Sequence, residues 1–318
     1  MSFKDIKGQD RAISFLKGSI ETGRMSHAYI FHGPSGVGKK LTAVNFAKAV
    51  NCLGGGASSC DACASCRKSD SSNHPDLSIL KPEKEGSAIG IDAVRALIKD
   101  VGLKPYEGKK KFYIIDEASS MKEEAQNALL KTLEEPPSDS VIILIAESLG
   151  RLFPTIVSRS QAVKFFPLRI DEVRDILVEK YGVEAPKAHI LAHLSSGRLG
   201  EALRYRDEEF FAKRDRVITA LADRTFFESD FDKLTKADLK IYLNILLTWY
   251  RDILVAKAGG VDGPEVVNID RKEAILAEAA GTGFDRLDRM IRQVISTNSF
   301  VEQNVNPKLA MAALGVSI

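Results

Sequence analysis

Long apolar runs are missing from this sequence of 318 residues. No stretch reaches the roughly 18 consecutive apolar residues that a membrane-spanning helix needs, so a membrane partner is not expected. The amino-terminal stretch MSFKDIKGQDRA contains no apolar signal core. Internal repeats and low-complexity segments are also missing. The sequence therefore predicts a cytoplasmic globular protein with room for two or three domains.

A dominant sign of charge is missing as well. The chain has 45 basic and 43 acidic side chains, with a formal net charge of +2. This balance neither demands nor excludes a nucleic-acid partner, because a local basic patch would be enough to contact DNA. The basic run at residues 109–111 is typical of a solvated strand start.

Cysteine is scarce and confined to one short segment. The pattern Cys52-x7-Cys60-x2-Cys63-x2-Cys66 contains all four cysteines of the chain. Without an export signal, metal ligation is favoured over disulfides. Four thiolates complete a tetrahedral Zn²⁺ shell, which makes the site structural and able to pin a loop with few apolar residues. The alternatives are four free thiols, or His74 as a ligand, although His74 is better interpreted as a turn residue.

Strand and helix patterns alternate in the first half of the chain. The expected strands are 28–32, 111–115 and 141–146, and the expected helices are 39–51, 91–101 and 122–134. This alternation predicts a parallel sheet covered on both faces, hence an α/β fold. After residue 167 only helical patterns occur. The clearest covers 237–257, where apolar residues share one face.

A glycine-rich loop joins the first expected strand to the first expected helix. The sequence Gly33-Pro-Ser-Gly36-Val-Gly38-Lys39 is a phosphate-binding loop in the context that confirms this motif. Its glycines allow backbone N–H groups to surround phosphate oxygens, and the helix amino terminus adds partial positive charge. Lys39 is expected to reach the terminal phosphates of a bound nucleotide such as ATP.

The metal-binding part of this motif is altered. Lys40 replaces the Ser or Thr that normally ligates Mg²⁺, and Thr42 lies on a different side of the helix. The acidic pair Asp116-Glu117 follows the strand 111–115. In ATPases with this loop, such residues hold Mg²⁺ and orient the attacking water. ATP binding is therefore expected to be possible, while Mg²⁺ ligation and hydrolysis are in doubt.

The motifs together resemble the clamp-loader branch of AAA+ proteins. Residues 127–137 (NALLKTLEEPP) are the sharpest match to the gamma/tau and delta prime subunits of bacterial DNA polymerase III. A zinc module after the phosphate-loop helix is another mark of that group. The resemblance implies an AAA+ sheet domain at 1–167 with a zinc module at 52–66. A helical lid at 168–207 and an all-helical collar at 208–318 would follow.

The resemblance also assigns a role to Arg159. In this family a Ser-Arg-Cys motif carries an arginine that reaches the ATP site of a neighbouring subunit, and here the matching residues are Ser158-Arg159-Ser160. A guanidinium suits this role because its planar fork binds two phosphate oxygens. Gly200 stands at the position of the family's lid arginine, so this arginine is a second functional group missing from the chain's own ATP site.

Two functional hypotheses follow from the resemblance. The first is a weak or non-hydrolysing delta prime-like subunit that donates Arg159 to a neighbour. The second is an active gamma/tau-type ATPase. The delta prime-like hypothesis is favoured by Lys40, Gly200 and the chain's end at residue 318. The active ATPase is favoured by Lys39 and the pair Asp116-Glu117. Either would act with gamma/tau and delta subunits in a hetero-pentameric ring that loads a sliding clamp onto primed DNA. An unrelated zinc-containing kinase would not account for residues 127–137.

Overall fold

The computed structural model describes residues 1–84, 86–223, 225–226, 235–259, 266–302 and 305–317. The chain forms two compact units. The first contains Met1–Leu168 and Arg198–Gly200, and the second contains Arg169–Gly197 and Glu201–Ile318. The first stretch of the first unit ends at Leu168, one residue after the predicted boundary at 167, and the predicted domain boundaries stay predictions. The further separation of a lid from a collar stays a prediction.

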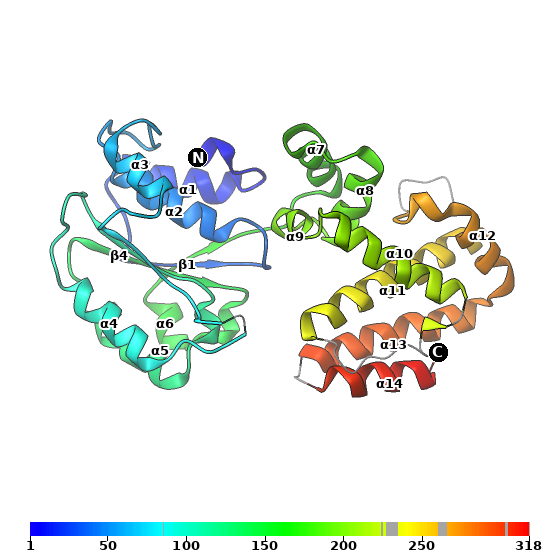
Figure 1. Ribbon diagram of the computed structural model, residues 1–318. Helices are drawn as coiled ribbons and strands as arrows, with labels where there is room; N and C mark the ends of the chain where they lie inside the picture. The colour runs from blue at the N-terminus through cyan, green and yellow to red at the C-terminus, as the bar shows by residue number, and fades with distance from the viewer. Residues whose placement is uncertain (85, 224, 227–234, 260–265, 303–304, 318) are drawn as a thin grey trace. The chain divides into compact units, whose positions relative to one another are not determined.

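The first unit is built on a parallel sheet of five strands (Figure 1). Their order is β2 (Leu77–Leu80), β3 (Lys111–Ile115), β4 (Ser140–Ala146), β1 (Ala28–His32) and β5 (Gln161–Lys164). All neighbouring pairs are parallel, as the alternating pattern predicted. The three strands expected from sequence are the three central ones, and every residue of β3 and β4 is buried.

Helices cover both faces of this sheet (Figure 1). One face carries η1 (Phe3–Asp5), α1 (Asp10–Glu21) and α2 (Lys39–Val50), with α3 (Ala64–Asp70) beyond α2. The other carries α4 (Ile91–Val101), α5 (Glu123–Glu134) and α6 (Pro154–Ser158), with the short turns η2 (Ala118–Ser120) and η3 (Leu149–Arg151). The expected helices 39–51, 91–101 and 122–134 correspond to α2, α4 and α5.

Alternating side chains of the strands build two cores. On the α2 face, Phe46 makes edge-to-face contacts with Tyr29 and Phe112 at centroid distances of 5.4 and 5.6 Å. On the other face, Ile30 and Leu129 are fully buried. Aromatic pairs of this geometry contribute about 0.5–1.5 kcal/mol beyond the area they bury. The sheet is thus a rigid platform for the loops at its edges.

The second unit is all helical among the residues that the structure describes. Its elements are α7 (Ile170–Tyr181), α8 (Ala185–Leu194), α10 (Glu208–Ala222), α11 (Lys236–Lys257), η5 (Ile269–Arg271), α12 (Lys272–Gly281), α13 (Phe284–Glu302) and α14 (Pro307–Ser317), while α9 (Leu199–Arg204) begins in the first unit and continues into the second. The expected helix 237–257 is α11. A capping box between Thr235 and Asp238 starts it, and its apolar face buries Trp249. Across the described ranges, no helix is long and apolar enough to span a bilayer.

Candidate functional site

The phosphate loop lies at the carboxyl edge of the sheet. It connects β1 to α2, while Asp116 and Glu147 directly follow β3 and β4. Carboxyl ends of parallel strands meet at one edge, and ligands of open α/β sheets bind in the crevice there. The sheet therefore brings the predicted loop and the predicted carboxylate to one edge.

The loop backbone has the conformation of a phosphate cradle. Gly33, Gly36 and Gly38 have φ values of 145°, 78° and 92°, in the region that favours glycine. At Gly33 a close approach adds a second restriction, because a Cβ there would lie 2.3 Å from the carbonyl oxygen of Phe165. Gly38 is also the N-cap of α2, so the amino-terminal N–H groups of this helix open onto the loop.

Lys39 is held inside the loop. Lys39 is only 7% exposed, and its ammonium donates to the carbonyl oxygens of Gly33 and Pro34 at 2.5 and 2.6 Å. Burial lowers the pKa of Lys39, and the negative charges of Glu147 and Asp116 partly oppose this effect. The ammonium is therefore positioned where phosphate oxygens would enter the cradle.

Lys40 and Asp116 form an ion pair with an Nζ to Oδ2 distance of 3.1 Å. The sequence predicted that Lys40 removes the hydroxyl ligand of Mg²⁺ and that its ammonium repels a cation. In the structure this ammonium also pairs with the carboxylate that would hold Mg²⁺. Thr42 offers no replacement, because its hydroxyl donates to the carbonyl oxygen of Gly38 at 2.9 Å. Glu117 is exposed and has a left-handed backbone with a φ of 53°. The position expected to hold Mg²⁺ is therefore changed, whereas the three loop glycines and Lys39 keep the arrangement that a phosphate site needs.

Gly200 lies against the phosphate loop within the first compact unit. Its N–H donates to the carbonyl oxygen of Gly36 at 2.8 Å. A Cβ at Gly200 would lie 2.9 Å from the Cα of Gly36, closer than such atoms approach. An arginine at this position therefore requires a different placement of the backbone, which is a physical reason for the glycine found here.

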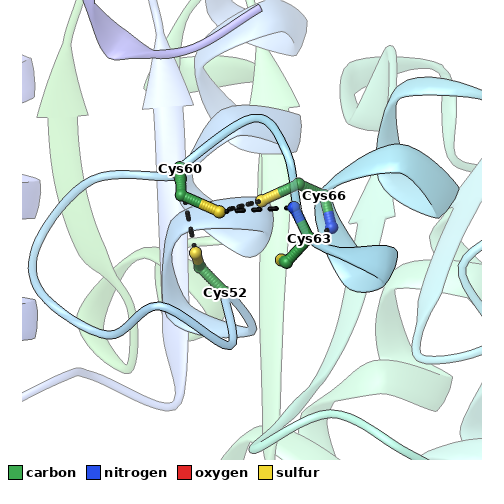
Figure 2. A group of neighbouring side chains, drawn as sticks. All are labelled: Cys52, Cys60, Cys63 and Cys66. Atoms are coloured by element: carbon green, nitrogen blue, oxygen red, sulfur yellow. Dashed lines mark hydrogen bonds between the residues drawn. The ribbon is translucent and has the colours of Figure 1, made fainter.

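The four cysteines form a second candidate site at the end of α2 (Figure 2). Their sulfur atoms all lie within 4.8 Å of one another, and the Cys60 and Cys66 sulfurs are 4.0 Å apart. A tetrahedral zinc with Zn–S bonds of about 2.3 Å places its sulfurs about 3.8 Å apart. The cluster therefore fits a closed four-thiolate metal site.

Backbone donors also suit thiolates in this cluster. The N–H groups of Cys60, Cys63 and Cys66 donate to the sulfurs of Cys52, Cys60 and Cys63 at 3.3, 3.4 and 3.5 Å. Such bonds lower the pKa of the Cys60 thiol. His74 is not part of the group. It contacts the Ser65 hydroxyl through Nε2 at 3.1 Å and accepts the Asp76 N–H through Nδ1 at 3.1 Å, so both ring nitrogens already have partners.

A buried lysine ties the cysteine module to α2. The side chain of Lys48 has no exposed surface, and its ammonium lies 2.6 Å from carboxylate oxygens of both Asp61 and Asp70. It also donates to the carbonyl oxygen of Met1 at 2.8 Å. Asp61 belongs to the cysteine loop and Asp70 ends α3. These bonds dock a segment that has little apolar surface of its own.

Arg159 lies at the opposite edge of the sheet from the phosphate loop. It follows α6 and precedes β5, so it lies near the amino end of that strand. One terminal nitrogen is 2.9 Å from a carboxylate oxygen of Glu134, and the other donates to the carbonyl oxygen of Thr155 at 3.1 Å. Its side chain is 37% exposed. The guanidinium is thus oriented yet accessible.

Three site residues escaped sequence reasoning in their present roles. Lys40 forms an ion pair with Asp116. The negative charge of Glu147 acts on the Lys39 ammonium. Glu134 forms an ion pair that orients Arg159. Glu134 lies within the stretch 127–137 on which the resemblance rests, so the sequence had already singled out this segment. No sequence signal identified Glu147, because its proximity to Lys39 depends on the strand order.

Comparison with known proteins relates both halves of the chain to one family. Models described as DNA polymerase III, delta subunit, and as its C-terminal part match residues 8–169 and 208–314. The delta prime subunit of DNA polymerase III from Bacillus subtilis is 35% identical over 94% of this chain and 92% of its own length.

Two further proteins show weaker or partial similarity. The tau subunit from Escherichia coli is 33% identical over 69% of this chain, which spans only 34% of that longer protein. A crystal structure of a gamma subunit-related protein from Thermotoga maritima aligns with 96% of this chain and 97% of its own, at 19% identity and a TM-score of 0.48. The family models and the Bacillus relative carry the assignment and confirm the resemblance drawn from residues 127–137. The chain therefore belongs to the delta prime subunit family of DNA polymerase III.

Proposed function

We propose that this chain is a clamp-loader subunit that assembles with gamma/tau and delta subunits and helps to load the sliding clamp onto primed DNA. The similarity to a delta prime subunit over nearly the full length of both chains supports this role. An AAA+ ring of five subunits in the cytoplasm, with a lid at 168–207 and a collar at 208–318, is part of the proposal.

The separation of Arg159 from the phosphate loop is the observation that carries the mechanism. His32, the residue before the loop, pairs with Lys164 at the carboxyl end of β5, whereas Arg159 precedes Gln161 at its amino end. The four residues of β5 span roughly 13 Å at about 3.3 Å per residue. This exceeds the reach of an arginine side chain, so Arg159 cannot serve the loop of its own chain. It serves the ATP site of a neighbouring subunit.

The chain's own ATPase activity is weak or missing in this proposal. The ion pair between Lys40 and Asp116 and the internal bond of Thr42 leave no ordinary Mg²⁺ ligand set. Without a metal to neutralise the developing phosphate charge, the Glu117 carboxylate that would orient an attacking water is not enough for hydrolysis. The alternative is an active gamma/tau-type ATPase, favoured by Lys39 and by the acidic pair.

A structural Zn²⁺ held by the four cysteines completes the proposal. The sulfur separations and the N–H donors on three thiolates support it. With four protein ligands there is no open position for substrate, so the metal stabilises the module and takes no part in hydrolysis.

The test compares Arg159→Ala with Lys39→Ala in a reconstituted loader. Arginines supplied in trans contribute about 10³–10⁵ in rate at a single site of GTPases, and a ring with several sites would show a smaller net loss. We expect Arg159→Ala to assemble normally and to impair ATP-dependent clamp loading. Arg159→Lys should rescue it only in part, because an ammonium lacks the bidentate fork.

Two comparisons make the test specific. Arg95→Ala removes another exposed arginine, whose guanidinium lies 3.9 Å from the Asp92 carboxylate on the same helix, and should leave loading unchanged. Lys39→Ala should be much milder than Arg159→Ala. A silent Arg159→Ala together with a damaging Lys39→Ala would refute the trans role and favour the active ATPase.

A further inference from the structure

Lys40 stands at the point where a phosphate-loop ATPase holds its metal. Its ammonium lies 3.1 Å from the Asp116 carboxylate, and its side chain is 47% exposed. An ammonium has three N–H donors, so contact with Asp116 leaves donors for a phosphate oxygen. Lys40 can therefore link the carboxylate to a phosphate chain, as a metal ion does in related sites.

Mg²⁺ cannot share this place with Lys40. Magnesium needs near-octahedral oxygen ligands at about 2.1 Å, and here the carboxylate is already paired with a cation. Binding the metal would break the ion pair and bring a dication close to an ammonium. Thr42 supplies no hydroxyl ligand, since its hydroxyl is bonded to Gly38. The residues present do not fit Mg²⁺.

The phosphate cradle itself fits a nucleotide. The three loop glycines have the backbone conformation that turns N–H groups inward, and Lys39 is buried among them. Two of the three donors of Lys39 bond the Gly33 and Pro34 carbonyls, which leaves one for a phosphate oxygen.

The charges around the loop also favour an anion without metal. Lys39, Lys40 and Lys164 are positive, against the carboxylates of Asp116 and Glu147. His32 stays neutral near pH 7, because burial and the neighbouring Lys164 and Lys39 lower its pKa. A free nucleotide carries two more negative charges than its Mg²⁺ complex, so these cations attract the free form more strongly.

We propose that the phosphate loop of this chain binds nucleoside di- or triphosphate without Mg²⁺, with the ammonium of Lys40 in place of the metal. Excess Mg²⁺ then weakens binding, because it withdraws the free nucleotide. Bound nucleotide would stay in the loop without turnover. The inference concerns the chain's own loop and is independent of the role of Arg159, so either can fail alone.

Isothermal titration of the full-length chain with ATP and ADP tests this, once in EDTA and once in excess Mg²⁺. Wild type should bind more tightly in EDTA than in excess Mg²⁺. Lys40→Thr restores a hydroxyl and releases Asp116, so Mg²⁺ should tighten its binding about tenfold, within the usual range for two coupled ligands. Lys40→Ala should lose affinity in EDTA, because the ammonium is gone.

The outcomes separate the contributions clearly. Lys39→Ala should abolish binding in both buffers and so locate the nucleotide in the loop. Circular dichroism checks that each variant remains folded. Wild-type binding that Mg²⁺ tightens as much as in Lys40→Thr would overturn the inference. A folded wild type that binds neither nucleotide in either buffer would overturn it as well, while leaving the clamp-loading result unaffected.

Discussion

Replacing the buried Lys48 should release the cysteine module from α2. The change Lys48→Met keeps the apolar stem and removes the ammonium, which bonds Asp61, Asp70 and the carbonyl oxygen of Met1. Bonds to charged groups contribute about 1.5–3 kcal/mol each when buried. Both carboxylate side chains are 40% exposed and can be hydrated after the change, which reduces each contribution to about 1 kcal/mol.

With about 1 kcal/mol for the Met1 carbonyl, the expected loss is about 3 kcal/mol, or about 100-fold in the opening equilibrium of the module. Hydrogen exchange of the amides in residues 60–70 measures this opening directly. Amides of the central strands should be unaffected, because the module is attached to the sheet domain from outside its core.

Lys68→Met provides the matched control. Lys68 lies in the same helix α3, but its side chain is 45% exposed and pairs with Glu107 at the surface. Such pairs contribute about 0–1 kcal/mol, so exchange should change less than about fivefold. If Lys48→Met and Lys68→Met gave the same small effect, the buried ammonium would not be what docks the module.

Three further predictions concern single groups. Cys63→Ser should lower bound zinc from about one per chain to less than half, by metal analysis, with an unchanged far-ultraviolet spectrum. Glu134→Gln should cost about 0.2–1 kcal/mol by urea unfolding and impair clamp loading less than Arg159→Ala. Burial acts to raise the pKa of Asp76, but three backbone N–H groups from residues 106–108 outweigh it and lower the pKa. Their stabilisation should be present above about pH 4 and disappear as pH falls through the lowered pKa, in nuclear magnetic resonance titrations of these amides. Asp76→Asn should remove that dependence.

The sequence predicted the elements whose side chains are buried. The runs AYIFH, KFYII and VIILIA became the three central strands, because central parallel strands are apolar on both faces. The edge strands β2 and β5 were not predicted. The sequence QAVK of β5 is exposed except at Val163, and LSIL of β2 is only half-buried, so neither carries a strong apolar signal.

The candidate sites were predictable as motifs but not as contacts. The cysteine spacing alone indicated a cluster, because ligands close in sequence are close in space. The pairing of Lys40 with Asp116 depends instead on the strand order. Asp116 follows β3, which lies two places from β1 in the sheet, and the two residues are 76 positions apart in sequence. Long-range pairs of this kind follow from topology, which periodicity does not encode.

The placement of Arg159 and the phosphate loop at opposite edges of one sheet gives the subunit a direction. In a heterologous contact the arginine edge of one subunit meets the loop edge of the next. Contacts of this kind repeat head to tail, so neighbours form an ordered row in which each subunit has one neighbour on each side. In such a row, a subunit that does not hydrolyse ATP lacks only the activity of its phosphate-loop edge, and its Arg159 edge can still serve a neighbour. The order of subunits, rather than their number alone, then decides which ATP sites have an arginine.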